Sequence, residues 1–263
     1  MTTCRAALIG CSRVGAFIDN EMPPDNHRQP YSHGAGYTAC DRTDLIALSD
    51  VRRGVMDQAG IRYNVPQAKH YLDYNEMIEK EKPDIVSVAT QPEQRADIVI
   101  YAAEHGVRAI YAEKALSASL EEADAMREAI ERNKVLFNMG TNRRWHTGYD
   151  TMIEVIRNGR LGALKTGISH MTGTLFNTPS HISDLLFRLN EDNPVVWAQA
   201  HLPKGDGIID GDILHEDPGA HGMFQFENGV TAWCLNSGFL IFSYFLPLYL
   251  SNTGCCKWKS VAS

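Results

Sequence analysis

The sequence lacks the charge patterns that mark nucleic-acid-binding and membrane-surface proteins. It has no block of basic residues, and its 32 acidic residues outnumber its 25 basic residues, which gives a net charge of −7. Nucleic acid and anionic membranes are therefore poor partners, because both attract positive charge. The first residues also lack the basic stretch and apolar core of a secretory signal peptide. We therefore expect a cytoplasmic protein.

Cysteine is scarce, and none of its spacings matches a metal or redox motif. Without a CxxC pair, we expect free thiols in a reducing compartment rather than disulfides. No apolar run is long enough to cross a bilayer, and the longest, Phe239–Leu250, contains Pro247. That run is expected to be a buried strand, an oligomer contact or an abnormal end. The six cysteines are Cys4, Cys11, Cys40, Cys234, Cys255 and Cys256.

The composition, 44% hydrophobic and 22% charged, suits two modest globular domains. The chain opens with an apolar strand, Arg5–Ile9, followed by Gly10-Cys11-Ser12-Arg13-Val14-Gly15 and an apolar helix start. Gly10 and Gly15 match the first and third glycines of a dinucleotide-binding turn, and Ser12 stands at the second. Such a turn brings backbone N–H groups close to a pyrophosphate. All six turn residues are therefore predicted to bind a dinucleotide cofactor.

The next strand ends in an acid that fits the same cofactor. Leu45–Asp50 is apolar up to Asp50, whose carboxylate can accept hydrogen bonds from ribose hydroxyls. The spacing from Gly15 is long because the proline-containing segment Met22–Pro30 breaks the first crossover helix. We expect NAD as the cofactor, with Val51 and Arg52 beside it. NADP stays open, because Arg52 and Arg53 can meet a 2′-phosphate.

Two further parallel strands end in polar residues. Asp84–Ala89 leads into Thr90-Gln91-Pro92-Glu93, a turn expected beside the nicotinamide ribose, and then into a helix over Ala96–His105. Strands that alternate with helices in this way predict a doubly wound parallel sheet.

Val107–Tyr111 leads into Ala112-Glu113-Lys114-Ala115, and Ser117 is expected to cap the helix that follows. Lys114 thus follows the carboxyl end of a strand, where open α/β sheets bind ligands. Its charge can hold a substrate hydroxyl and help to move a proton. Glu113 and Lys114 are also expected to contact the cofactor. The alternative is a surface lysine paired with Glu113.

A second domain is expected over residues 141–263, after a Rossmann domain over residues 1–140 whose last strand is Val135–Gly140. Tyr149–Arg157 is predicted as a helix, and Lys165–Thr174 and Gly222–Ala232 as antiparallel strands. His215 and His221 are six residues apart with Pro218-Gly219 between them, so we expect no metal site.

A helix is also expected to open within Asn177–Leu186, with Leu185, Leu186 and Leu189 facing a core. His181 is the best acid/base candidate, since imidazole titrates near neutral pH. Asn177 is either a substrate contact or part of the helix entry, and Asp184 is expected to orient its neighbours. The indoles Trp145 and Trp197 are interpreted as core residues rather than substrate platforms.

From about residue 5 to residue 237, the chain resembles the glucose–fructose oxidoreductase, inositol dehydrogenase and rhizopine-catabolism (Gfo/Idh/MocA) family. The resemblance implies a Rossmann domain, a second domain on an open, mainly antiparallel sheet, and NAD(P)-dependent oxidoreduction at a hydroxyl carbon of a sugar, cyclitol or related polyol. It also implies that Lys114, His181 and Asn177 are catalytic and that Arg143 and Trp145 contact the substrate. The motifs are the Gly10–Gly15 turn, Asp50, Val88-Ala89-Thr90-Gln91-Pro92, Glu113-Lys114-Ala115, Arg143-Arg144-Trp145, Gly159-Arg160-Leu161-Gly162 and His181-Ile182-Ser183-Asp184.

Several residues depart from the family pattern. Ala115 replaces the proline of Glu-Lys-Pro, Arg95 stands where histidine is common, and Asn177 replaces an acid. Residues 239–263 do not resemble the family's further strands, which suggests a truncated or frame-shifted end. These departures keep two alternatives open, an inactive dinucleotide-binding protein and an NAD-recycling hydrolase or lyase. The apolar run at Phe239–Leu250 predicts a homo-oligomer.

Overall fold

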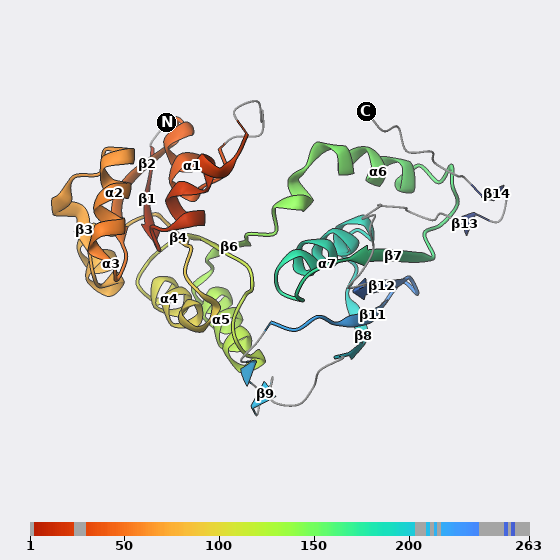
Figure 1. Ribbon diagram of the computed structural model, residues 1–263. Helices are drawn as coiled ribbons and strands as arrows, with labels where there is room; N and C mark the ends of the chain where they lie inside the picture. The colour runs from red at the N-terminus through yellow and green to blue at the C-terminus, as the bar shows by residue number, and fades with distance from the viewer. Residues whose placement is uncertain are drawn as a thin grey trace. The chain divides into compact units, whose positions relative to one another are not determined.

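The computed structural model divides the chain into two compact units, Met1–Gly140 and Thr141–Ser263, each with its own sheet (Figure 1). The structure describes residues 3–23, 30–202, 209–210, 213–214, 217–236, 250–251 and 254–255. No helix within these ranges is both long and apolar enough to cross a membrane.

The first unit alternates strands and helices along the chain. Its elements are β1 (Cys4–Ile9), η1 (Arg13–Phe17), η2 (Ile18–Glu21), α1 (His33–Ala39), β2 (Thr43–Ser49), α2 (Arg53–Tyr63), η3 (Gln67–Lys69), β3 (His70–Tyr71), α3 (Tyr74–Glu81), β4 (Ile85–Val88), α4 (Pro92–Glu104), β5 (Ala109–Ala112), α5 (Leu120–Asn133) and β6 (Leu136–Met139).

The six strands of this unit form one parallel sheet in the order β3-β2-β1-β4-β5-β6. The strand order reverses direction between β1 and β4. At such a switch point, the connections after neighbouring strands leave in opposite directions, which opens a crevice at the carboxyl ends. The predicted Rossmann sheet is confirmed, and its crevice lies beyond Ile9 and Val88.

Apolar side chains cover both faces of the parallel sheet. On one face, Val86 and Ile110 pack with residues of α3, α4 and α5. On the other, Leu8 and Leu48 pack with Met56 of α2. Strands buried on both faces need this near-continuous apolar composition, and it explains why their sequences do not alternate. Helices α4 and α5 lie side by side along one face (Figure 1).

Two helix starts differ from those predicted. Helix α4 begins at Pro92 rather than Ala96, because a proline in the first turn has no N–H to leave unpaired. Helix α5 is capped by Ser119 rather than Ser117. The Ser119 hydroxyl accepts a hydrogen bond from the Glu122 N–H at 3.1 Å, and the Glu122 carboxylate accepts one from the Ala118 N–H at 2.8 Å.

The second unit mixes helices with short strands. Its elements are η4 (Asn142–Trp145), α6 (Thr147–Arg157), β7 (Thr166–Met171), α7 (Thr178–Leu189), β8 (Val195–His201), β9 (Ile209–Asp210), β10 (Ile213–Leu214), β11 (His221–Phe226), β12 (Thr231–Asn236), β13 (Leu250–Ser251) and β14 (Gly254–Cys255).

The larger sheet of the second unit has the order β7-β12-β11-β8. Strand β11 is antiparallel to both of its neighbours, whereas β7 and β12 are parallel. The expected strand over Gly222–Ala232 is wrong, because Gly229, with φ +81°, turns the chain between two strands of a hairpin. The expectation that Lys165–Thr174 pairs antiparallel is also wrong. The sheet is mixed, with two of its three pairings antiparallel.

Helix α7 covers one face of this mixed sheet. Leu185 is 1% exposed, and Leu186 and Ile182 pack against Met171 and Cys234. The predicted apolar face of the helix is therefore confirmed. The run Phe239–Leu250 lies outside the described residues except for Leu250. His215 and Glu216 lie outside them too.

A buried carboxylate, Glu81 of α3, links that helix to η3, β3 and β1. Its oxygens accept hydrogen bonds from Lys69 Nζ, both at 2.8 Å, and from the Tyr71 hydroxyl. Arg5 Nη2 lies 3.8 Å away. Burial alone raises the pKa of Glu81, but the hydrogen bonds from Lys69 and Tyr71 lower it below its ordinary value of 4.5.

We expect Glu81→Gln to lower the free energy of unfolding by about 1–3 kcal/mol near neutral pH, because it removes a charged hydrogen-bond acceptor. A lowered folded-state pKa gives stability that is present above the unfolded-state pKa and lost as pH falls. Urea unfolding should therefore show that the difference in the free energy of unfolding between wild type and Glu81→Gln becomes smaller as pH falls through about 4. A gap independent of pH would contradict this role for Glu81.

Candidate functional site

The turn after β1 is built from backbone segments too close together for side chains. Gly10 has φ +89°, and a Cβ there would lie 2.7 Å from the Ala89 carbonyl oxygen. A Cβ on Gly15 would lie 1.9 Å from the Gly10 oxygen. Both positions therefore require glycine. The Ser12 carbonyl accepts the Ala16 N–H at 2.7 Å, which begins the helical turn η1.

Asp50 fastens the end of β2 to this turn. One carboxylate oxygen accepts the Cys11 N–H at 2.8 Å, and the other accepts the Arg52 N–H at 2.9 Å. Arg52 Nε also lies 3.3 Å from the carboxylate. The side chain of Asp50 is only 4% exposed. The predicted turn and the predicted acid thus form one hydrogen-bonded unit, although 39 residues separate Cys11 from Asp50.

These residues border a cavity of about 520 Å³ at the carboxyl ends of β1, β2 and β4. This volume falls within the usual range for small-molecule sites, about 300–1,000 Å³. Leu72, Tyr74 and Asp97 also line it and were not foreseen, because nothing in their local sequence marks them. The predicted cofactor residues that line it are Gly10, Ser12, Asp50, Val51, Arg52, Thr90 and Gln91.

The other predicted cofactor residues lie close to these in the chain. Val14 lies in η1, and Pro92 occupies the first turn of α4. The Arg13 guanidinium binds the Glu21 carboxylate at 2.7–2.9 Å on the surface. Arg13 is therefore engaged with the helix that follows the turn.

Two residues at the start of α4 have buried polar atoms without a partner among the described residues. These atoms are Thr90 Oγ1 and the Nε and Nη1 of Arg95. Arg95 is 1% exposed, and its Nη2 donates to the Thr90 carbonyl. Burial lowers the pKa of Arg95 to about 10, against the opposing charges of Glu113 and Glu93. An orphaned hydroxyl at the edge of a cavity is suited to binding a polar ligand.

Glu113 and Lys114 follow β5 directly. The Glu113 N–H donates to the Val88 carbonyl at 2.9 Å, which continues the ladder to the end of β4. The Glu113 carboxylate lies 3.2 Å from His33 Nε2, so Glu113 bonds to a histidine that the sequence did not single out. The peptide bond between Lys114 and Ala115 is cis.

In the second unit, an ion-pair network brings η4 to α7. Arg144 Nε donates to both oxygens of Asp184 at 3.0 and 2.9 Å, and Nη2 donates to Asp192 at 2.8 Å. Asp184 therefore positions a neighbouring segment, as expected. The residues on either side of Arg144, Arg143 and Trp145, are thereby held near α7.

The candidate substrate residues of this unit lie on α7 and η4. Asn177 is the N-cap residue of α7, and His181 lies in its first turn, one turn before Asp184. Trp145 is 62% exposed and Trp197 is 45% exposed. The interpretation of both indoles as core residues is therefore wrong, and Trp145 is accessible to a ligand.

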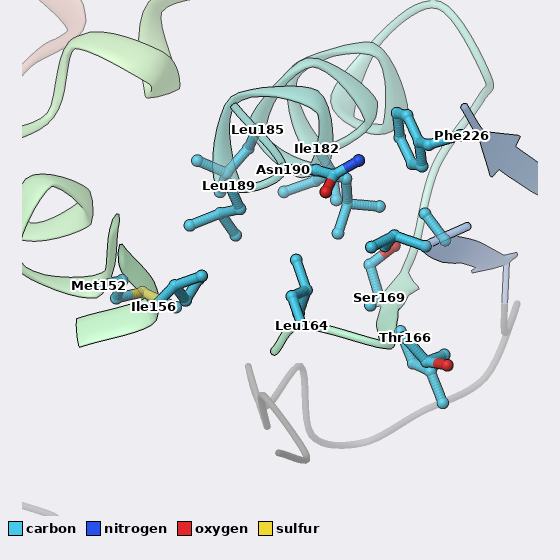
Figure 2. Close-up of a pocket in the computed structure, with 15 residues that line it drawn as sticks. Met152, Ile156, Leu164, Thr166, Ser169, Ile182, Leu185, Leu189, Asn190 and Phe226 are labelled. Carbon is cyan, nitrogen blue, oxygen red and sulfur yellow. The ribbon is translucent and has the colours of Figure 1, made fainter. Parts of the chain in front are cut away.

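A second cavity, in the second unit, has about 60 Å³ and a mainly apolar lining to which Thr166, Ser169 and Asn190 add polar atoms (Figure 2). Leu185 and Leu189 of α7 face it together with Ile156 of α6 and Leu164 (Figure 2). Its volume is far below that of a small-molecule site. We interpret it as a packing gap. Within the described ranges, no group of three or more His, Cys, Asp or Glu is arranged to hold a metal ion.

Comparison with known proteins places the first unit within a described family. The profile of the GFO_IDH_MocA family, described as "Oxidoreductase family, NAD-binding Rossmann fold", matches residues 4–141.

Several characterised proteins are similar to longer parts of the chain. A myo-inositol 2-dehydrogenase from Thermotoga maritima is 27% identical over 158 residues, which are 60% of this chain and 42% of that protein. An inositol 2-dehydrogenase from Salmonella paratyphi B is 23% identical over 220 residues, 79% of this chain and 60% of that protein. The chain therefore spans about half the length of these relatives.

The fold also matches solved structures. An inositol dehydrogenase homolog from Azotobacter vinelandii, crystallised with NADH and myo-inositol, superposes with a TM-score of 0.69 at 18% identity. The superposition covers 92% of this chain and 66% of that one. At this identity the likeness establishes the fold.

Cys11 lies in the glycine turn, and Cys40 follows the last residue of α1. The two thiols should react with an alkylating reagent at very different rates. Burial, with the nearby Asp50 charge, raises the pKa of Cys11, whereas hydrogen bonds from the Arg42 N–H and Thr43 lower the pKa of Cys40. Because the thiolate is the nucleophile, iodoacetamide should alkylate Cys40 well before Cys11 at mildly alkaline pH. Peptide mass spectrometry measures both rates. Equal rates in the folded protein, rather than only in urea, would show that Cys11 is a reactive thiol.

Proposed function

Because this chain belongs to the oxidoreductase family with an NAD-binding Rossmann fold, we propose that it binds NAD and transfers a hydride between nicotinamide and a substrate carbon. The carbon bears a hydroxyl or carbonyl group and belongs to a cyclitol, a sugar or a related polyol. When bound, the dinucleotide supplies or accepts the hydride. The protein contributes binding, orientation and proton exchange.

The observation that carries the cofactor proposal is the glycine turn after β1, which borders a cavity of about 520 Å³. This volume is usual for a small-molecule site. Gly10 and Gly15, where no Cβ fits, let the chain turn tightly from β1 into η1. The start of such a helical turn is where backbone N–H groups can approach a pyrophosphate. The orphaned Thr90 hydroxyl supplies a further polar contact. The Asp50 carboxylate lines the same cavity and favours the 2′-hydroxyl of NAD over the 2′-phosphate of NADP, since two negative charges repel.

The residues proposed for proton exchange are His181 and Lys114. A neutral imidazole at His181 accepts the substrate hydroxyl proton during oxidation and returns it during reduction. The Lys114 ammonium donates a hydrogen bond to the substrate and stabilises developing negative charge. Asn177 binds a neighbouring hydroxyl through its amide, which cannot take up a proton as a carboxylate does. Arg143 and Trp145 are proposed substrate contacts.

The polyol class is proposed from relatives whose names specify inositol, and from the exposed indole of Trp145, which offers an apolar face to a ring. Turnover on a panel of cyclitols, sugars and related polyols with NAD and NADP, followed by nicotinamide absorbance, tests it. Binding of a dinucleotide without turnover of any substrate would instead favour a non-catalytic role. Self-association stays a prediction, which light scattering checks.

Asp50→Asn should weaken NAD binding by roughly 10-fold and NADP binding much less, because it removes the charge and keeps one oxygen acceptor for the Cys11 N–H. Isothermal titration calorimetry measures both affinities. Arg127→Gln is a matched control, since its guanidinium pairs with Asp124 on the surface of α5. Equal weakening of the two dinucleotides by Asp50→Asn would remove Asp50 from cofactor discrimination. Failure of wild type to bind either dinucleotide would overturn the proposal.

Lys114→Ala and His181→Ala should each lower the turnover rate by roughly 10²-fold or more, while dinucleotide affinity changes little. The rate of oxidation should rise with pH through the neutral range in wild type, because the base must be unprotonated. That rise should be absent in His181→Ala. Near wild-type turnover in either variant would exclude that residue from proton exchange.

A further inference from the structure

A buried histidine, His33, contacts the residue before Lys114. It begins α1, and its side chain is 3% exposed. Nδ1 lies 2.6 Å from the Ser87 hydroxyl of β4, and Nε2 lies 3.2 Å from Oε1 of Glu113. One imidazole therefore links α1, β4 and the end of β5.

The charges around Glu113 decide which atom donates in this contact. Burial raises the pKa of Glu113, but the hydrogen bond from His33 and the positive charges of Arg95 and Lys114 lower it below its ordinary value. An ionised carboxylate has no proton to give, so Nε2 of His33 is the donor. Arg95 acts at longer range, since its own hydrogen bond goes to the Thr90 carbonyl.

Packing leaves the Glu113 carboxylate little freedom to move. A Cβ on Gly140 would lie 2.7 Å from Oε1, so glycine at that position makes room for the carboxylate. The Glu113 N–H is bonded to the Val88 carbonyl. The ring of Tyr111 lies 4.9 Å from that of His33 between centroids. Backbone and carboxylate are thus held by different contacts, and His33 is a direct hydrogen-bond partner of the carboxylate.

We propose that His33 is a positioning residue for Lys114. By holding the Glu113 carboxylate, it fixes the backbone and the charge next to the lysine on which the proposed function relies. The charged and titratable groups around Glu113 are His33 from α1, Arg95 from α4, and Tyr111 and Lys114 from the β5 segment. His33 makes two hydrogen bonds, to Ser87 and to Glu113. Among these groups, it is the one that amide side chains can replace while keeping one of its bonds and losing the other.

Two amide variants separate those hydrogen bonds. In His33→Gln, the amide nitrogen reaches the position of Nε2 and can still donate to Glu113. In His33→Asn, it reaches only the position of Nδ1, beside Ser87. Ser87→Ala is the matched control, because it removes the Ser87 contact and keeps the one to Glu113. Circular dichroism and thermal unfolding check that each variant folds.

The first readouts need no substrate. Carbon-13 NMR of the Glu113 carboxyl, assigned with Glu113→Gln, should give a higher Glu113 pKa in His33→Asn and an unchanged one in His33→Gln and Ser87→Ala. The resonance of ¹³C-methylated Lys114, assigned with Lys114→Arg, should move in His33→Asn alone. With an active substrate, kcat should fall about 10-fold or more in His33→Asn and stay within about 3-fold of wild type in the other two. Dinucleotide affinity should stay unchanged in all three.

Similar changes in His33→Gln and His33→Asn, or no change in either, would overturn the positioning role. An altered Glu113 pKa without any change at Lys114 would overturn it as well. If wild type turns over no substrate but both NMR patterns appear as expected, the positioning role stands and the proposed function fails. The two conclusions are therefore tested separately.

Discussion

Three backbone segments meet at Gly10 with no space for a side chain between them, and the candidate cofactor site depends on this contact. The end of β4 at Ala89 lies against Gly10, and Gly10 lies against Gly15 in the first turn of η1. The close approach brings the carboxyl ends of β1 and β4 together at the switch point of the sheet. The cavity, the position of Asp50 and the start of α4 all follow from it. A single Cβ at either glycine would push these segments apart.

Local sequence was sufficient to predict this part of the structure. The glycine spacing, the apolar strands and the acid after β2 each depend on a few adjacent residues, and the parallel sheet follows from the alternation of strands and helices. The same reasoning failed at helix starts, where Ser117 and Ser119 offer similar caps two residues apart. It also merged β11 and β12 into one strand, although Gly229 marks the turn between them.

Contacts between residues far apart in the chain could not be predicted from the sequence. The hydrogen bond between His33 and Glu113 joins residues 80 apart, and no local pattern predicts that they meet. The burial of Arg95 was hidden for a related reason, since a charged residue on a helix is normally exposed. The second sheet adds another case, because alternation of side chains predicts a strand and says nothing about the direction of its partner.

The parallel pairing of β7 with β12 has a consequence for synthesis of the chain. Thr166 of β7 pairs with Thr231 of β12, so one edge of the second sheet waits for a strand made 65 residues later. In the first unit, each strand pairs with the next strand along the chain, with the exception of the step from β3 to β4. Folding is slower when a long loop must close before its ends can form favourable contacts, because loop closure costs chain entropy. We therefore expect the first unit to fold before the second as the chain is synthesised, with β7 unpaired until β12 has been made.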